Sequence, residues 1–402
     1  MRKLLILFLN FSMILGIISN AYATELLVND SLDTMSDNGV PGLLDRDDFE
    51  NEDDYWDYIE EHPEADEGLS RNDSIMDADG ATPIESNATF RYKFSGLPSN
   101  YPVQKVYVGS TYIYALQRCG NTQSKNPDDT LARCEINGET ATCIDYMTLY
   151  NFGHGQTLDW MEHNGNAYFI VGCKSNTEND SRWSLQVGRV QYDAGGSVSY
   201  TDIPRLSNIN RANSTGTAYG DTKRVDAALS SDKSKLIIRM KNTVNEIQYT
   251  VYNMNTLNSL FDSKERQSAK YVECTNSTVK GACLAFFRQT TSSTKVQPNN
   301  SFQGIELADG GSIYISGGNP GEPPRIAKMT GSGSSYNYTY RMTIKHAYFN
   351  NNSEKGTEIE GLQLKGDYVY FSVHDTYAGS NAPAKDCIYS VNKSDFSMNN
   401  TH

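Results

Sequence analysis

Short apolar segments separated by polar turns recur along most of the chain and form one repeated pattern. Each copy starts at a polar residue, runs on as a short apolar strand, turns through Gly, Asn or Asp, and resumes as a strand rich in aromatic and β-branched residues. This alternation is typical of β-hairpins. The copies begin at Gln104, Gln156, Asp226, Gln303 and Glu360. Their second strands are expected to start near Tyr112, Tyr168, Leu236, Ile313 and Tyr368.

Repetition of one supersecondary unit indicates an array in which neighbouring units cover each other's apolar faces. No run with a helical period and convincing length interrupts the strand signals, and Asn137-Gly138 predicts a tight type I′ hairpin. A two-layer sandwich would also contain many short strands, but it would not repeat one hairpin. We therefore predict an all-β fold, a five-bladed β-propeller over residues 88–402, in which residues 89–94 complete the last blade.

The N-terminus has the features of a secretory signal. Arg2 and Lys3 precede an apolar run over residues 4–18, and Ala21-Tyr22-Ala23 matches a cleavage site. The apolar run is too short and too interrupted to span a bilayer well, and no other stretch is a candidate. We expect residues 1–23 to be a signal peptide and the protein to be secreted.

Charge is concentrated in one segment. The chain has a net charge of −14, yet residues 24–87 alone carry 21 acidic residues and two arginines. The remainder from residue 88 onward is close to neutral, which argues against nucleic acid as a partner. High charge and few apolar residues disfavour a core within residues 24–87, so we interpret them as an acidic linker. The alternative is a pro-segment that covers a site until it is removed.

Seven cysteines in a secreted chain suggest disulfides with one thiol left over, and Cys274 and Cys283 are close enough in sequence to clamp a loop. The chain contains no C-x-x-C spacing and no complete EF-hand pattern. We therefore expect no metal site and no cofactor.

The first polar residue of every hairpin occupies an equivalent position. Because the innermost strands of a propeller line its channel, these side chains are expected to form a ring at one mouth. The ring is either a pocket for a sugar, phosphate or ion, or a set of bridges between blades and to channel water. His154 lies near the same mouth and His374 follows the last recurring strand. The candidate ligand-binding residues are Gln104, His154, Gln156, Asp226, Gln303, Glu360 and His374.

A second polar set lies three residues further along each clear copy, at Asp159, Glu306 and Gln363, on the opposite strand face. We expect it to be structural and to point between blades. Aromatic residues offer a further, weaker signal. Trp160 is expected in the core, and Trp183 follows a loop where it would be exposed. Alternating tyrosines share one strand face and are interpreted as packing rather than a sugar platform: Tyr336, Tyr338 and Tyr340.

Several short phrases, in order along the chain, resemble the helveticin-J family, the large heat-labile bacteriocins of lactic acid bacteria. They are the Phe-Gly-His-Gly-Gln-Thr run ending at Thr157, the hairpins at Gln303 and Glu360, and the Gly-rich stretch over residues 317–322. The resemblance covers residues 88–392. The family is similar to five-bladed propeller domains of phage receptor-binding and teichoic-acid-associated proteins, which implies binding to the Gram-positive cell surface.

The resemblance implies a secreted bacteriocin-like protein that binds a cell-surface glycopolymer such as teichoic acid and kills or inhibits bacteria. The sequence contains no serine nucleophile elbow, Cys–His signature or P-loop, so a non-enzymatic role is favoured. One alternative is a hydrolase or lyase of a wall glycopolymer that uses His154 and Glu360 at the channel mouth. Another is a protein-interaction propeller, because the fold alone does not decide among them.

Overall fold

The computed structural model describes residues 84–119, 128–177, 181–289, 297–332, 335–350, 356–375 and 382–396. The chain divides into two compact units, Met1–Asp73 and Ser74–His402, and every described residue belongs to the second. The predicted signal peptide and most of the acidic segment lie outside the described residues. Residues 84–87, which the sequence assigns to that segment, form strand β1 (Ile84–Asn87) and pair with a strand of the second unit.

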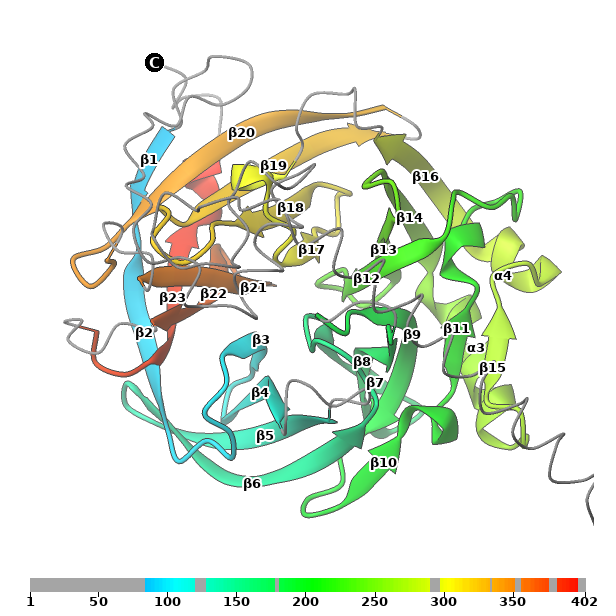
Figure 1. The fold of residues 1–402 in the computed structure, drawn as a ribbon, viewed down its shortest axis with the longest axis horizontal. Helices are drawn as coiled ribbons and strands as arrows, with labels where there is room; N and C mark the ends of the chain where they lie inside the picture. The colour runs from blue at the N-terminus through cyan, green and yellow to red at the C-terminus, as the bar shows by residue number, and fades with distance from the viewer. Residues whose placement is uncertain are drawn as a thin grey trace, which may run out of the picture. The chain divides into compact units, whose positions relative to one another are not determined.

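Strands of the second unit form antiparallel runs whose innermost members lie around a common centre (Figure 1). One run contains β3 (Val103–Val108), β4 (Tyr112–Cys119), β5 (Asp128–Asn137) and β6 (Thr140–Tyr150). The next contains β7 (Leu158–His163), β8 (Asn166–Ser175), β9 (Ser184–Gln191) and β11 (Arg205–Ser207), with β15 (Tyr271–Glu273) parallel to its edge. The short strand β10 (Ser197–Ser199) lies parallel to β6.

The remaining runs continue the same order around the centre. One contains β12 (Thr222–Leu229), β13 (Lys235–Asn242), β14 (Ile247–Asn253) and β16 (Cys283–Gln289). Another contains β17 (Ile305–Leu307), β18 (Ile313–Gly317), β19 (Arg325–Ser332) and β20 (Ser335–Lys345), with β1 parallel to its outer edge. The last contains β21 (Thr357–Lys365), β22 (Tyr368–Asp375), β23 (Asp386–Asn392) and β2 (Thr89–Ser95).

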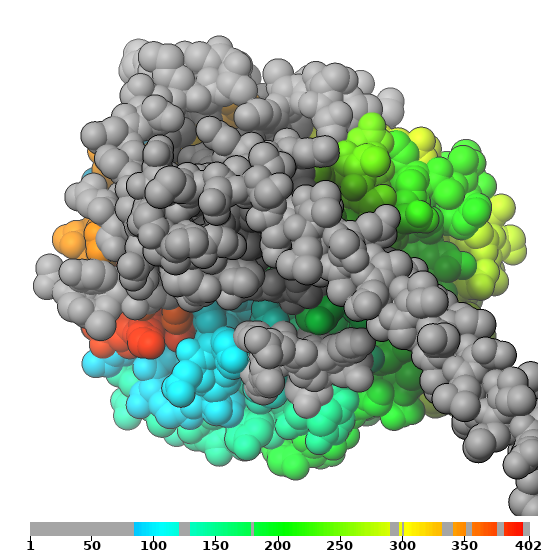
Figure 2. All heavy atoms as spheres, viewed as in Figure 1, coloured from blue at the N-terminus to red at the C-terminus, as the bar shows by residue number. Residues whose placement is uncertain are grey.

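Strand β2 joins the two ends of the described chain. It is antiparallel to β23, with Thr89 opposite Ser390, and this confirms the pairing predicted for residues 89–94. Its other edge is parallel to β6, where Phe94 lies opposite Ala141. The run that contains β21 is thereby fused with the run that contains β3 into one sheet. In the space-filling view, atoms of β3–β6 lie beside atoms of the following run along the lower edge of the visible face (Figure 2).

The predicted hairpins are present, and one turn differs from its predicted type. Asn164 and Gly165 both have positive φ, 51° and 74°, between paired residues of β7 and β8, which is the backbone of a type I′ turn. Asn137 pairs with Thr140, so Gly138 and Glu139 form the other turn, with positive φ only at Gly138. This is a type II′ turn, because Gly rather than Asn supplies the first central residue.

Two helices correct the expectation that no helical run of convincing length exists. Helix α3 (Met254–Glu265) begins where the side chain of Asn253 accepts a hydrogen bond from the Thr256 amide, and α4 (Ser277–Ala282) is capped by Asn276 in the same way. The buried residues of α3 follow helical spacing but are outnumbered by polar ones: Met254, Leu257, Asn258 and Phe261. Among the described residues, no helix is long and apolar enough to cross a membrane.

The apolar core lies mainly between adjacent runs rather than within them. Leu116 of β4 packs in one cluster with Leu158 and Phe169 of the following run. Ile237 of β13 shares another with Ile315 of β18. Because each sheet face is covered by its neighbour, no run could bury its apolar residues alone, as expected for a repeat array.

The expected disulfides are not formed in this structure, which describes all seven cysteines and joins none of them to another. The proposed clamp between Cys274 and Cys283 is not formed either, although both residues pack in one apolar cluster. Cys274 follows β15, at the edge of the sheet that contains β9, whereas Cys283 opens β16 in the sheet that contains β13. The two residues are close in sequence but belong to different sheets.

Candidate functional site

Four of the predicted ring residues form a hydrogen-bonded chain at the centre. The side-chain amide of Gln156 donates to Gln104 at 3.1 Å and to Gln303 at 2.8 Å, and Gln104 donates to Glu360 at 3.2 Å. These side chains come from four different runs, and all are buried. The bonds from Gln104 bridge neighbouring runs, whereas the Gln156–Gln303 bond links the run that contains β7 with the run that contains β17, which are not adjacent. Such bridges are the structural alternative that the sequence left open for this set.

Asp226, the fifth ring residue, is held by a cation instead of an amide. Arg239 of β13 donates to the Asp226 carboxylate at 2.7 Å and to the main-chain carbonyl of Gln303. The same guanidinium donates to Gln297 at 2.9 Å. Arg239 is fully buried and links Asp226 to the ring through the backbone of Gln303. Sequence analysis missed this arginine.

His154 is packed beside the ring as a neutral imidazole. Its Nδ1 lies 2.9 Å from the Ser181 carbonyl oxygen and 3.2 Å from Arg118 Nη1, and its ring stacks 3.8 Å from that of Trp183. Burial, together with the charges of Arg118 and Arg224, holds the pKa of His154 well below 6.5. Trp183 is only 5% exposed, which corrects the expectation of an exposed indole. Its burial follows from this packing against His154.

Cationic and aromatic side chains continue from His154 into a cluster. The Arg224 guanidinium lies 3.4 Å from the centre of the Trp183 ring and 4.6 Å from that of the Phe302 ring. The Arg239 guanidinium lies 3.6 Å from the centre of the Phe302 ring. Such stacking is favourable for a guanidinium, which is planar and weakly hydrated. We call this set the arginine–aromatic cluster: Arg118, His154, Trp183, Arg224, Arg239 and Phe302.

Strand register brings a further amine to the cluster. Lys241 of β13 lies directly opposite Arg224 of β12, so both side chains are on one face of the sheet. Burial lowers the pKa of Lys241 to about 7, so its charge depends on pH near neutrality. The signal for this face was present in the sequence. Arg224 and Asp226, like Arg239 and Lys241, are charged residues at alternate positions of otherwise apolar strands.

His374 pairs with Asp386 and does not belong to the arginine–aromatic cluster. Its Nδ1 is 2.9 Å from the Asp386 carboxylate, which also accepts a hydrogen bond from the Val103 amide at 2.9 Å. The pair thus connects β22 and β23 to the start of β3. His154 contacts Arg118, Ser181 and Trp183, whereas His374 contacts Asp386, so the two predicted histidines have separate surroundings.

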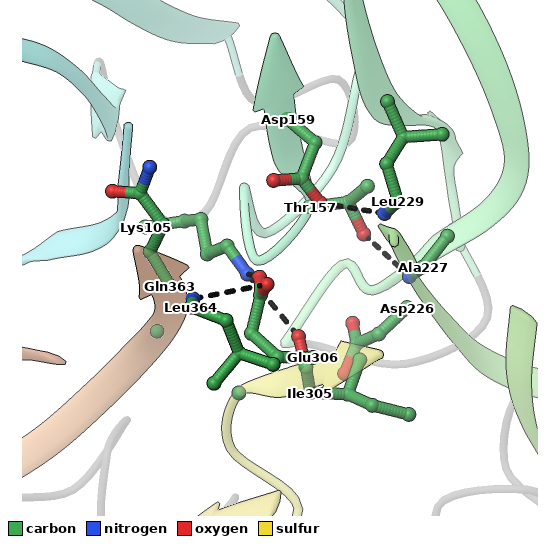
Figure 3. A network of polar contacts seen from close by, with 12 residues as sticks. Lys105, Thr157, Asp159, Asp226, Ala227, Leu229, Ile305, Glu306, Gln363 and Leu364 are labelled. Carbon is green, nitrogen blue, oxygen red and sulfur yellow. Dashed lines mark hydrogen bonds and ion pairs between the residues drawn. The ribbon is translucent and has the colours of Figure 1, made fainter. Parts of the chain in front are cut away.

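The second polar set ties three of the innermost strands to the strand that follows each of them (Figure 3). Asp159 accepts a hydrogen bond from the Leu229 amide at 2.8 Å, and Gln363 accepts one from Val108 at 2.6 Å. Glu306 accepts one from the Leu364 amide at 3.3 Å. These contacts confirm the structural role predicted for Asp159, Glu306 and Gln363.

Lys105 and Glu306 form a buried ion pair within this layer, and neither side chain is more than 3% exposed. Lys105 Nζ is 2.6 Å from Glu306 Oε1 and 3.2 Å from the Ile305 carbonyl oxygen, as Figure 3 shows. Burial and the nearby Asp159 carboxylate raise the pKa of Glu306 to about 7, although Lys105 opposes the shift. Sequence analysis missed Lys105, because its partner is 201 positions away.

The side chains gathered at this centre can donate and accept hydrogen bonds and can pair with charges. Within the described ranges, no group of three or more His, Cys, Asp or Glu side chains could hold a metal ion.

Trp160 is half-buried against the core between the runs that contain β4 and β8, as predicted. The side chains of Tyr336, Tyr338 and Tyr340 lie outside the described residues, although their strand β20 is present.

Comparison with known proteins gives one family. The family described as bacteriocin helveticin-J matches residues 86–394. Bacteriocin helveticin-J of Lactobacillus helveticus is 27% identical over 325 residues, which cover 72% of this chain and 92% of that protein.

Solved structures resemble the chain only distantly. The GH43_1 enzyme of Xanthomonas citri complexed with xylose is 10% identical, covers 73% of this chain and 86% of its own, and gives a TM-score of 0.38. The periplasmic gluconolactonase PpgL of Pseudomonas aeruginosa is 12% identical, covers 68% and 65%, and gives 0.35. TM-scores this low support no inference about the function of this chain.

Proposed function

Because the chain belongs to the helveticin-J family, we propose that it is a secreted bacteriocin-like protein that binds an anionic cell-surface glycopolymer of Gram-positive bacteria and inhibits or kills them. We further propose that its runs of strands are the blades of a five-bladed β-propeller. Three separate sheets and two runs fused through β2 and β6 support that count. Residues 1–23 would then be the export signal.

The observation that carries the proposal is the arginine–aromatic cluster. Three guanidinium groups converge beside the central ring, and Asp226 is the carboxylate that contacts Arg224 and Arg239. Guanidinium groups are suited to planar, bidentate recognition of phosphate. Arg118 and Arg224 are each 7% exposed, whereas Arg239 is fully buried, so Arg118 and Arg224 are the cations that would meet the phosphodiesters of the proposed polymer.

Binding to isolated cell walls tests the proposal directly. Wild-type protein should co-sediment with walls from a Gram-positive bacterium, and binding should fall when teichoic acid has been stripped from them. Arg118→Gln should weaken binding by about tenfold or more, as expected for loss of one charge-assisted contact. Arg133→Gln is the matched control, because Arg133 is a half-buried arginine that pairs with Asp145 on β5 and β6, outside the cluster.

Near-UV circular dichroism of each variant would establish that the fold is retained. Equal binding to intact and stripped walls, or equal binding by wild type and Arg118→Gln, would contradict the anionic ligand. Release of phosphate or reducing sugar from walls by wild type, abolished in His154→Ala, would instead indicate the hydrolase alternative. Growth inhibition measured with the same proteins would separate binding from killing.

The acidic segment supports a refinement of the proposal. Residues 24–83 hold nearly all of the acidic excess, and their charge is opposite to that of the cluster. We propose that the segment competes with the polymer and weakens wall binding. A synthetic peptide of residues 45–67 added in excess should then lower co-sedimentation, and a scrambled peptide of the same charge controls for screening.

A further inference from the structure

Two cysteines face each other across the hairpin of β5 and β6. Cys134 and Cys143 are opposite residues in the antiparallel register, next to a bulge that accommodates Ile144 on β6. Both side chains belong to one apolar cluster, in which Cys134 is fully buried and Cys143 packs as a half-buried neighbour. The two thiols therefore lie on the same side of the sheet.

The register satisfies the geometric requirement for a disulfide. Opposite residues of an antiparallel pair have Cα atoms roughly 4.5–5.5 Å apart, within the range of about 4.4–6.8 Å that disulfides span. We propose that Cys134 and Cys143 are a redox-modifiable pair that closes to a cross-strand disulfide when the protein meets a disulfide oxidant. The site is independent of the arginine–aromatic cluster and of the proposed ligand.

The two thiols have different roles in the exchange. Cys143 is the more accessible, and the hydrogen bond between the thiols lowers the pKa of Cys143 while raising that of Cys134. The Cys143 thiolate attacks the oxidant disulfide, forms a mixed disulfide and releases one thiolate. Cys134 then loses its proton and attacks the Cys143 sulfur, which releases the second thiolate. Two protein thiols are oxidised, and one external disulfide is reduced to two thiols.

The position of the pair gives the bond a structural effect. Thr140, Ala141 and Thr142 of β6, immediately before Cys143, pair with β2. A covalent link between β5 and β6 would therefore reinforce the strand on which the fusion of the two runs depends. It would also close a short loop around the Gly138 turn, and a disulfide stabilises chiefly by restricting the unfolded chain.

Peptide mapping tests the proposal on the intact native protein. The purified chain is incubated with excess oxidised glutathione, alkylated under denaturing conditions and cleaved after Glu139, which leaves the two cysteines on separate peptides. We expect these peptides to be joined by a bond that dithiothreitol breaks, and the protein to carry two fewer alkyl groups. Cys173 and Cys387, which are buried in separate apolar clusters, serve as the internal control and should remain fully alkylated.

Two variants separate a specific pair from general oxidation. Cys143→Ser should abolish the linked peptide and leave Cys134 alkylated, and Cys119→Ser should change nothing. The oxidised wild type should also resist urea to a higher midpoint than the reduced wild type, and this difference should vanish in Cys143→Ser. Full alkylation of Cys134 and Cys143 after oxidation of the native wild type would overturn the proposal, as would linkage of either to another cysteine.

Discussion

Removal of the Lys105 ammonium should destabilise the protein in a strongly pH-dependent way. Lys105→Met keeps an unbranched side chain of similar length but takes away the group that lies 2.6 Å from Glu306. Glu306 would keep its hydrogen bond from the Leu364 amide and lose its cation. At pH 8 the variant must bury an ionised carboxylate beside Asp159, or pay to protonate it.

The magnitude follows from the burial of the pair. Breaking a buried ion pair costs about 3–5 kcal/mol when the remaining charge stays ionised. At pH 5 the carboxyl is neutral, since the pKa of Glu306 is already raised to about 7. The loss should then shrink to about 1–2 kcal/mol, the cost of leaving hydrogen bonds unmade. The difference between the two pH values is therefore expected to be about 2–3 kcal/mol.

The raised pKa of Glu306 also makes the stability of the wild type depend on pH. Because the folded pKa of Glu306 lies above its ordinary 4.5, its contribution is fully present below pH 4.5 and is lost as pH rises to about 7. Integrated over this interval, the loss is about 3 kcal/mol. His154 acts in the opposite direction below pH 6.5, since its folded pKa is lowered. Comparison of the variant with wild type at each pH cancels the histidine.

Urea unfolding at pH 5 and pH 8 measures the effect. Lys365→Met is the matched control, since Lys365 is a half-buried lysine that donates to the Gly109 carbonyl rather than to a carboxylate. Its effect should be small and similar at both pH values. The double variant Lys105→Met/Glu306→Gln should lose the pH dependence. An equal loss for Lys105→Met at pH 5 and pH 8 would refute the reasoning.

Further outcomes are expected from single changes elsewhere. Asp159→Ala should cost about 1–3 kcal/mol in urea unfolding, because it leaves the buried Leu229 amide without its acceptor, whereas Asp159→Asn should recover most of the loss. Arg189→Met removes the contact with Asp262 at 2.7 Å, so amide hydrogen exchange in α3 should accelerate while that in β13 stays slow. Gly138→Ala should lower stability by about 1–2 kcal/mol through its positive φ alone, since an added Cβ meets no atom within 4 Å; no change would argue against the turn geometry.

Much of the fold could be predicted because its signals are local. Each hairpin is indicated by alternating apolar and polar residues and by a turn that contains Gly or Asn. The second strands begin at Tyr112, Ile313 and Tyr368, as expected. Helix α3 escaped prediction because it has only four buried residues among twelve. Its position depends on Arg189 of β9, which donates hydrogen bonds to Asn258 and Asp262. Because these residues are far from Arg189 in the sequence, no local pattern indicates the contacts.

The residues of the candidate ring could be predicted from the sequence, but their charged partners could not. Equivalent positions in a repeat identified Gln104, Gln156 and Gln303, which do meet at the centre. The partners that define the electrostatics come from other strands and from far along the chain. Arg239 reaches Asp226 because β12 and β13 are in a register that places them opposite each other, and such a register is fixed only by the assembled sheet.

Closure through β2 also has a kinetic consequence. Arg91 donates to the side chain of Ser390 at 2.7 Å, and 299 positions separate these residues. Strand β2 is synthesised early, but its partner β23 is available only when nearly the whole chain has been made. Pairing over such a long range is slow because the intervening loop must close first. The nascent protein is expected to persist as an open arc with an unpaired β2 edge. The sheet that contains β2 is completed only when the last strands have been made. Until then the unpaired edge exposes the chain to misfolding, chaperones and proteases.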